Sequence, residues 1–227
     1  MLDVACSTGR HAIRLAYRGF RPAGIDLSPF YIEHARQAGR EKGVDVNWVE
    51  GAVLDVHRLV DGPFDAFINM FTSIGHGGRE ADRRLFEGPS TLAAPGACLV
   101  VGTTNRDYLL KEFQDETLNL AGDIRVYQKR RLSEDGSRLL SEWHFFDATD
   151  GDLEPTLRIP MGQQLYDAAS LADLLTQVGW HIEATCDATA ARPGELGPVD
   201  AYSKNIWIMA TVDEDLTSST TAKGQLG

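Results

Sequence analysis

A turn of small residues and a carboxylate roughly 20 residues later have the spacing of a nucleotide-binding site. The turn runs from Asp3 through Cys6 and Ser7 to Gly9, between a short apolar stretch and a helical pattern. Small residues let the backbone N–H groups of such a turn approach a ligand closely. Asp26 ends the next apolar stretch, where a carboxylate can accept hydrogen bonds from both hydroxyls of a ribose. Together these features predict half of a nucleotide-binding α/β unit.

The residue types of this turn distinguish between two families. Dinucleotide-binding enzymes usually carry G-x-G-x-x-G here, whereas residues 3–9 read D-x-A-C-S-T-G with a single glycine. This run resembles motif I of the class I S-adenosylmethionine (SAM)-dependent methyltransferases, commonly D-x-x-C-G-T-G. The resemblance covers the chain from Met1 to about Thr211. A nicotinamide-dependent oxidoreductase is therefore the less favoured interpretation.

The resemblance implies that SAM is the cofactor and that it lies along the first turn and the ends of the following strands. Asp3 would position the turn and the amino-acid end of the cofactor, and Asp26 would bind its ribose. The cofactor-binding residues implied in this way are Asp3, Ala5, Cys6, Ser7, Gly9, Asp26, Leu27, Ala52, Val53 and Met70.

Two of these residues depart from the family pattern. Glycine is usual at the place of Ser7, and serine costs about 1 kcal/mol of strain there if φ must be positive. Its hydroxyl could also hydrogen-bond the cofactor, so the net effect stays open. Ala52 stands where the family has an acid that binds the adenine amino group, and that lost hydrogen bond costs roughly 1–3 kcal/mol if nothing replaces it. The backbone around Val53 could still meet the adenine edge.

The stretch 69–76, at the end of the expected strand 64–71, should lie nearest the reacting groups, because ligands bind beyond the carboxyl ends of parallel strands. Its residues 70–75, M-F-T-S-I-G, are similar to enzymes that N-methylate amino sugars. His76 is the best candidate for a general base, since an ordinary imidazole suits proton removal near neutral pH. A loop histidine without a role is the alternative. Tyr166, in a segment similar to the family pattern R-x-Y-T-x-x-E-L, is a second catalytic candidate.

Loops over the same face would shape a pocket for a small-molecule methyl acceptor, with transfer to oxygen, nitrogen or carbon. The polar and aromatic candidates for this pocket are Asn105, Arg106, Asp107, Tyr108, Gln164, Tyr202 and Ser203. A surface or packing role is the alternative for each. The departures at Ser7 and Ala52 motivate a second hypothesis, a SAM-binding module or partner subunit with weak or no activity.

The pattern along the chain predicts a Rossmann-like, doubly wound α/β fold with a mostly parallel seven-stranded sheet and an antiparallel last strand. Expected strands begin at residue 2 and cover 22–26, 44–49, 64–71, 97–103, 180–186 and 205–211, and expected helices cover 10–18, 29–42, 79–92 and the stretch between Asp167 and Gly179. The helix 79–92 could break at Gly88-Pro89, residues 51–59 form a loop or short helix, and 94–96 form a turn.

One domain is expected over residues 1–212, with a small antiparallel β-insert at 123–161 and a disordered tail at 213–227. Residues 124–160 alternate, carry many charges and contain Asp135-Gly136 and Asp150-Gly151, which predicts two or three strands joined by hairpins. The first strand begins at residue 2, so the helices that family members have before motif I are absent. Either the start lies upstream, or another chain covers the site, or the site is unusually open.

Composition limits the partners that we expect. The 227 residues carry a net charge of −11, which disfavours nucleic acid, and Lys129-Arg130-Arg131 fits a solvated strand face. Three cysteines without a C-x-x-C pair predict reduced core residues, a cytoplasmic protein and no metal site. Neither a membrane-spanning run nor a signal segment is present, so no membrane association is expected. The sequence leaves a homo-oligomer open.

Overall fold

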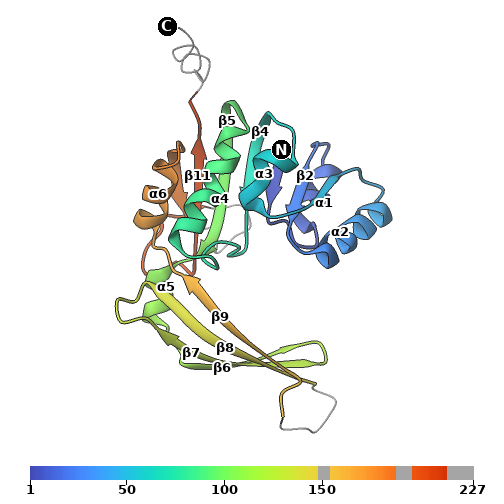
Figure 1. Cartoon of the computed structure of the whole chain (residues 1–227). Helices are drawn as coiled ribbons and strands as arrows, with labels where there is room; N and C mark the ends of the chain where they lie inside the picture. The colour runs from blue at the N-terminus through green and yellow to red at the C-terminus, as the bar shows by residue number, and fades with distance from the viewer. Residues whose placement is uncertain (148–153, 188–195, 214–227) are drawn as a thin grey trace, which may run out of the picture.

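The computed structural model describes residues 1–147, 154–187 and 196–213, and its larger element is a seven-stranded sheet (Figure 1). Its strands are β1 (Leu2–Val4), β2 (Ala23–Asp26), β3 (Asn47–Glu50), β4 (Phe64–Asn69), β5 (Ala93–Thr104), β10 (His181–Cys186) and β11 (Asn205–Thr211). Their order is β10-β11-β5-β4-β1-β2-β3, and β11 alone runs antiparallel to both of its neighbours. The other described pairs of this sheet are parallel. This topology confirms the predicted Rossmann-like α/β fold with an antiparallel last strand.

Helices cover both faces of this sheet. They are α1 (Arg10–Tyr17), α2 (Pro29–Lys42), the 3-10 turn η1 (Val53–Asp55), α3 (Val56–Leu59), α4 (Arg79–Thr91), α5 (Arg106–Lys111) and α6 (Ala168–Thr176). Helices α1 and α2 pack together on one face, and α3, α4 and α6 form the layer on the other. Within the described ranges, no helix has the length and apolar character needed to cross a membrane.

Local sequence signals set the ends of these helices. The Ser28 hydroxyl accepts a hydrogen bond from the Tyr31 N–H at the start of α2, Pro29 occupies the first turn, and Gly43 ends the helix with φ 64°. Asp167 forms a capping box with Ser170 at the start of α6, as its position before the apolar repeat predicted.

The central strands supply the core, because both faces of a parallel sheet are covered by helices. Leu2, Ile25, Phe67, Leu99 and Ile208 are fully or almost fully buried. Trp180 packs edge-on against Phe67 with 5.6 Å between ring centroids, and its indole N–H donates to the Phe86 carbonyl over 3.1 Å. Burying apolar surface stabilises a fold by about 25 cal/mol per Å².

Several expected boundaries differ from the structure, among them the start of β3, which is Asn47 rather than residue 44. Three further differences concern α4, β5 and β4. Helix α4 is unbroken, with Pro89 buried inside its last turn. The expected turn at 94–96 is an irregularity within β5, where the pairing with β4 shifts register and Gly96 has φ 71°. Strand β4 ends at Asn69 rather than at residue 71, because Phe71 and Thr72 adopt left-handed φ values of 59° and 61°, which no strand accommodates.

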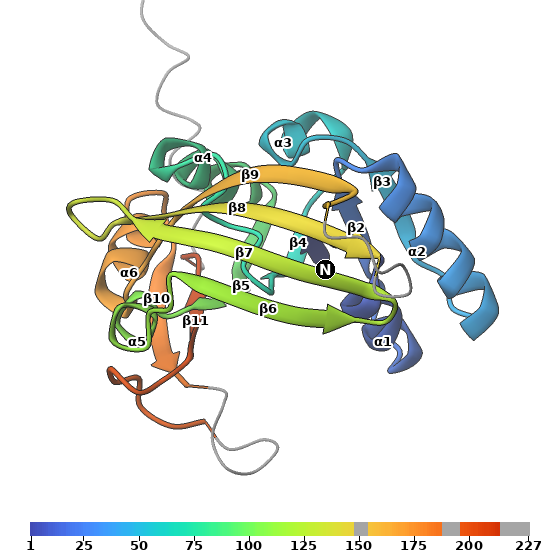
Figure 2. The ribbon, with the colours of Figure 1, turned by 90° about the horizontal axis from the view of Figure 1, so that it is seen from below.

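The second sheet is antiparallel and crosses below the first (Figure 2). Its strands are β6 (Glu116–Ala121), β7 (Ile124–Leu132), β8 (Arg138–Asp147) and β9 (Leu157–Gln164), in that order. The sheet confirms the predicted β-insert but extends beyond 123–161, since β6 pairs with β7 at its edge. Strand β6 was not predicted, although Leu118 and Leu120 alternate with Thr117 and Asn119, and both leucines are exposed at the edge of the sheet.

Two further expectations concern turns and the tail. Asp135-Gly136 lies in the hairpin between β7 and β8, where the Gly136 N–H donates to the Ser133 carbonyl over 2.9 Å. Asp150-Gly151 and the tail beyond Asp213 lie outside the described residues.

Candidate active site

The turn after β1 forms one wall of a cavity of about 650 Å³ at the carboxyl end of the larger sheet. Ala5 and Ser7 have left-handed φ values of 59° and 51°, so the strain expected for a serine at this position is present. Gly9 has φ 74°, and a Cβ atom there would collide with the ring of Trp48. Gly9 therefore shapes the turn from behind, and it does not line the cavity.

Asp26 fastens this turn to the start of α2. Its Oδ2 accepts from the Ser7 N–H over 2.8 Å, and its Oδ1 accepts from the Ser28 N–H over 2.9 Å. Each carboxylate oxygen retains a second lone pair, and Asp26 lines the cavity. The acid thus has both the structural role and the access to a ligand that its position predicted.

Asp3 is a buried acid in the same cavity, with 2 % of its surface exposed. The pKa of Asp3 is raised to about 7. Burial is the main cause and the nearby Asp26 charge adds to it, while a hydrogen bond from the Ala12 N–H, over 3.3 Å, opposes the shift. No described cation offsets the cost of burying this charge. A ligand with a positive group at this point would do so.

The end of β4 contributes two buried polar atoms without a partner in the described structure. The Asn69 side chain donates from Nδ2 to the Val4 carbonyl over 2.9 Å and so ties β4 to β1, while its Oδ1 has no hydrogen bond. The Ser73 Oγ is also unpaired, and Ser73 lines the cavity. Buried polar atoms normally find a partner, so the Ser73 hydroxyl, which lines the cavity, fits a polar ligand.

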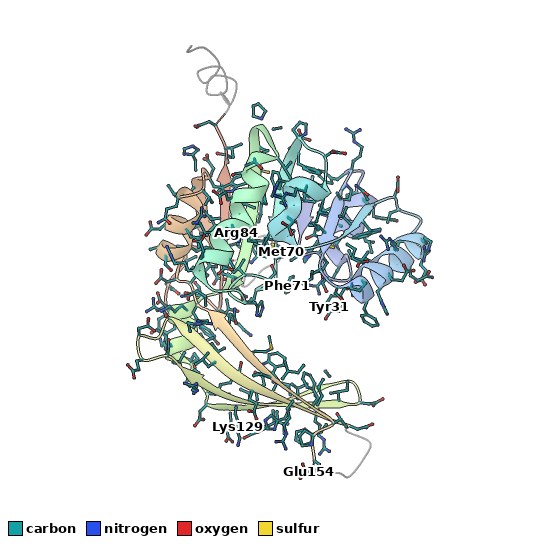
Figure 3. All side chains as sticks on the ribbon, in the orientation of Figure 1. Tyr31, Met70, Phe71, Arg84, Lys129 and Glu154 are labelled. Atoms are coloured by element: carbon teal, nitrogen blue, oxygen red, sulfur yellow. The ribbon has the colours of Figure 1, made fainter. Side chains whose placement is uncertain are left out.

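Phe71 forms the mouth of the cavity. The chain turns sharply at this residue, which leaves its ring 67 % exposed at the edge of the larger sheet that faces the antiparallel sheet (Figure 3). The ring stacks on His11 with centroids 5.3 Å apart, and the Arg10 guanidinium lies 4.3 Å from its centre.

A second cavity, of about 780 Å³, lies between the two sheets and shares Phe71 and His76 with the first. Its wall on the larger domain includes Thr72, Thr104, Tyr108, Glu112 and Lys204. Its floor is the inner face of the antiparallel sheet and includes Thr117, Gln128, Arg130, Ser141, Trp143 and Gln163. The lining is thus mostly polar, with a few apolar and aromatic side chains.

His76 occupies the loop between the cavities, and a buried carboxylate holds the base of that loop. The Gly75 N–H donates to Asp82 Oδ1 over 2.8 Å, and the Gly75 carbonyl accepts from the Gln164 N–H at the end of β9 over 2.8 Å. A Cβ atom at Gly75 would lie 2.5 Å from the Gln164 carbonyl oxygen. His76 itself is exposed and lines both cavities.

Tyr166 does not line either cavity, and its proposed catalytic role is therefore corrected. It is 1 % exposed, and its hydroxyl donates to Asp82 Oδ2 over 2.7 Å. Burial and the Asp82 charge both raise the pKa of Tyr166, which keeps the phenol protonated. Tyr166 thus positions Asp82, and through it the loop at Gly75.

Of the predicted cofactor residues, eight line the first cavity: Asp3, Ala5, Cys6, Ser7, Asp26, Leu27, Val53 and Met70. Gly9 and Ala52 do not, and Ala52 instead precedes η1 with its carbonyl accepting from the Asp55 N–H. The lining residues Thr8, Arg10 and His11 were not predicted from the sequence, whereas Phe71 and Ser73 lie in the predicted stretch 69–76. Arg10 and His11 begin a helix, and nothing in their residue types distinguishes the wall of a cavity from an exposed helix face.

Among the predicted acceptor-pocket loops, only Tyr108 lines the second cavity. Asn105 is buried and donates to the carbonyls of Asp200 and Ser203, and Arg106 forms an ion pair with Asp167 over 3.2 Å. These contacts hold the loops together. Asp107, Gln164 and Tyr202 are likewise outside both cavities.

Comparison with known proteins agrees with this geometry. Residues 1–96 match the family described as "Methyltransferase domain". The chain is 31 % identical to the glycine N-methyltransferase of Mus musculus over 122 residues, which cover 48 % of this chain and 42 % of that protein. It therefore spans less than half the length of the first curated relatives that it matches.

A longer match is found to the glycine/sarcosine N-methyltransferase of Halorhodospira halochloris. The two are 32 % identical over 203 residues, which cover 73 % of this chain and 75 % of that protein. The crystal structure of a SAM-dependent methyltransferase from Clostridium acetobutylicum shares the fold, with a TM-score of 0.77, 14 % identity and coverage of 93 % of this chain and 83 % of that one. The identity and coverage of the longer match, together with the matched domain, show that this chain belongs to the class I SAM-dependent methyltransferases.

Proposed function

We propose that the protein transfers a methyl group from SAM to an oxygen, nitrogen or carbon atom of a small molecule. The observation that carries this proposal is the meeting of two cavities at Phe71 and His76. The first cavity has a buried acid, Asp3, a partly exposed acid, Asp26, and the unpaired Ser73 hydroxyl, which suit a cofactor with an amino-acid end and a ribose. The second is of a size typical for small-molecule sites.

The lining residues suit the parts of SAM in order along the first cavity. Asp26 would accept hydrogen bonds from the ribose hydroxyls with its free lone pairs. Asp3 would pair with the cofactor's ammonium group, which gives the buried carboxylate a counter-ion. Val53 would meet the adenine edge through its backbone, since Ala52 offers no carboxylate.

SAM supplies a methyl group that is activated by a positively charged sulfur. The acceptor's lone pair forms a bond to the methyl carbon as the carbon–sulfur bond breaks, and S-adenosyl-L-homocysteine leaves. His76 would take the proton that an oxygen or nitrogen acceptor loses, a contribution of about 10²–10⁴-fold in rate. Holding donor and acceptor in line across the mouth at Phe71 is the larger contribution, about 7–11 kcal/mol in favourable cases.

Calorimetric titration tests the cofactor assignment. We expect binding of SAM and S-adenosylhomocysteine and no heat with NAD. A silent SAM titration beside a clear NAD signal would overturn the proposal. A methyl-transfer assay with radiolabelled SAM and a panel of amines, phenols and sugars then tests the reaction.

A SAM-binding module or partner subunit without activity is the second candidate, and two observations favour it. Ser7 holds a left-handed backbone conformation at a strained position, and Ala52 provides no acid for adenine. The two candidates differ in one result. Tight SAM binding without transfer to any acceptor of the panel, in this chain and in one extended upstream, would favour the module.

We also propose a cytoplasmic protein that acts on small molecules rather than on nucleic acid. The three cysteines are free, and the net charge of −11 repels a phosphate backbone. Cell fractionation and an electrophoretic shift assay with DNA and RNA test these two points. Sedimentation velocity would determine whether the protein forms a homo-oligomer.

A further inference from the structure

The inner face of the antiparallel sheet carries a cation that has no counter-ion in the described structure. Arg130 lies on β7 and lines the second cavity, and no ion pair joins it to any described acid. Its Nε is buried without a hydrogen-bond partner. Its guanidinium carbon lies 5.4 Å from the centre of the Phe113 ring.

Neighbouring side chains of the same face are neutral hydrogen-bonding groups. The register places Arg130 opposite Ser141 on β8, and Ser141 opposite Met161 on β9. Thr117 of β6 pairs with Gln128 of β7, and both line the cavity. The Thr117 hydroxyl, like the Arg130 Nε, is buried without a partner.

The charge of this cavity contrasts with that of the whole protein. Glu112 is the one carboxylate among the described residues that line it, whereas Arg130 and Lys204 are both cationic. The chain as a whole has a net charge of −11. A cavity with net positive charge in an acidic protein concentrates and selects anionic small molecules.

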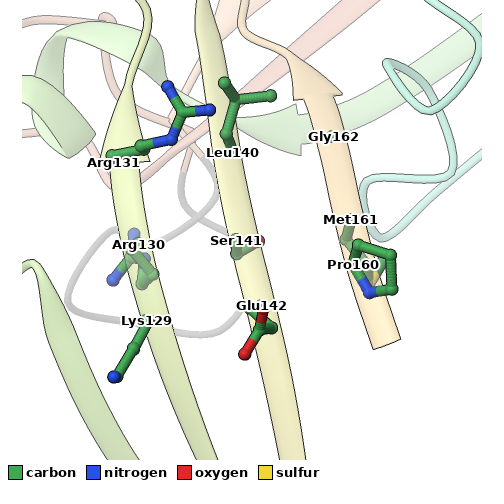
Figure 4. A pocket seen from close by; sticks show the side chains of 9 residues that line it. All are labelled: Lys129, Arg130, Arg131, Leu140, Ser141, Glu142, Pro160, Met161 and Gly162. Atoms are coloured by element: carbon green, nitrogen blue, oxygen red, sulfur yellow. The ribbon is translucent and has the colours of Figure 1, made fainter. Parts of the chain in front are cut away.

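The position of Arg130 separates it from the other basic residues of its strand. Side chains alternate along a strand, so Lys129 and Arg131 lie on the outer face, where the register places Lys129 beside Glu142 and Glu142 beside Pro160. Arg130 also borders the pocket that these residues line (Figure 4), but it is the one basic residue of the run that lines the second cavity as well. Lys129 and Arg131 are therefore exposed to solvent, whereas partial burial lowers the pKa of Arg130. Arg130 is thus the residue of this basic run that a ligand between the sheets would meet.

From this arrangement we infer that the methyl acceptor carries a carboxylate, which Arg130 binds from the floor of the second cavity. The inference rests on the proposed function and specifies its substrate class. A carboxylate fits better than a phosphate dianion, because Arg130 is the one cation on the floor of the cavity and the single positive charge in excess there, with Glu112 opposing Lys204 on the other wall, matches one negative charge. Guanidinium and carboxylate are matched in shape and form two parallel hydrogen bonds. The acceptor's nucleophile would then point to the mouth at Phe71 and His76.

Matched ligand pairs test this inference on the protein saturated with S-adenosylhomocysteine. The pairs are glycine and glycinamide, anthranilate and anthranilamide, and salicylate and salicylamide, each measured by calorimetry. In at least one pair we expect the carboxylate to bind about tenfold more tightly than its amide, as a charge-assisted contact requires. Arg130→Met should reduce that ratio to near one, and Arg131→Met, the adjacent arginine on the outer face, should leave it unchanged.

Several results would overturn the inference: no binding in any pair, equal binding of acid and amide, a preference for inorganic phosphate over the carboxylates, or an unchanged ratio in Arg130→Met. Circular dichroism and SAM affinity show whether the variant is folded, and Arg130→Gln replaces it if it is not. The proposed function fails separately, through absent SAM binding. Carboxylate selectivity without SAM binding would keep the anion site and reject the methyltransferase.

Discussion

The two cavities that meet at Phe71 are built by different means. The first cavity, which we propose holds the cofactor and call the cofactor cavity, is formed by short turns at the ends of buried strands. Backbone N–H groups, left-handed residues and a buried acid are fixed there by the core beneath them. The cavity below it has a floor of side chains on one face of an antiparallel sheet, many of them half-exposed. A change in the first disturbs the backbone, whereas a change in the second replaces one side chain. Such a division lets one donor site serve acceptors of different chemistry.

The largest effect that we expect comes from the loop where the cavities meet. His76→Ala should slow methyl transfer about 100-fold or more, because it removes the imidazole from the loop that lines both cavities. SAM affinity, measured by calorimetry, should stay within about twofold. His57→Ala, an exposed histidine of α3, is the matched control. An unchanged rate in His76→Ala would return this residue to a loop histidine without a role.

Next in size is a backbone effect at the turn of the cofactor cavity. Gly9→Ala and Gly19→Ala both place a Cβ at a positive φ, which costs about 1 kcal/mol. Only Gly9 has the Trp48 ring in the way, which adds about 1–3 kcal/mol of overpacking. Urea unfolding should therefore show the larger loss for Gly9→Ala. An equal loss of unfolding free energy in the two variants would mean that the turn at Gly9 is not packed rigidly against Trp48.

Asp26→Ala should weaken SAM binding at least about tenfold, since it removes the ribose acceptor and frees the N–H groups of Ser7 and Ser28. Calorimetry measures this, and Asp45→Ala, at an exposed acid, is the control. SAM affinity that survives the loss of Asp26 would remove this acid from the site.

A pH dependence of stability is expected at Asp3. Its pKa of about 7 in the folded protein lies above the usual value of 3.8, so the folded state retains the proton more strongly than the unfolded chain. The free energy of unfolding without ligand should therefore fall as the pH rises from about 4 to about 7, and then level off. Asp3→Asn should remove that slope in urea titrations, while Asp45→Asn should retain it.

Binding should change in the opposite direction at the same residue. SAM affinity of the unmodified protein should rise by up to about tenfold between pH 6 and pH 8, as Asp3 ionises and pairs with the ammonium group. Asp3→Asn should bind SAM weakly at both values. A flat affinity profile in the unmodified protein would contradict the assigned partner of Asp3.

The same contrast explains which features the sequence revealed. Motif I, Asp26 and the caps at Ser28 and Asp167 are local signals, because residue type and backbone conformation are coupled within a few positions. The inner floor of the antiparallel sheet is assembled from four strands, so the approach of Thr117 to Gln128 depends on pairing rather than on spacing. Tyr166 was misassigned for the same reason, since its partner Asp82 is 84 positions away along the chain.

Gly75 has a consequence for how this protein could diversify. The antiparallel sheet returns to the larger domain at Gln164, and one backbone hydrogen bond and a side-chain-free residue join the two there. Descendants that lengthen or rebuild the remote hairpins would alter which molecules enter without displacing the point of reaction. An insertion beside Gln164 would displace both the sheet that selects the entering molecule and the loop at the point of reaction. We therefore expect this junction to tolerate the fewest insertions.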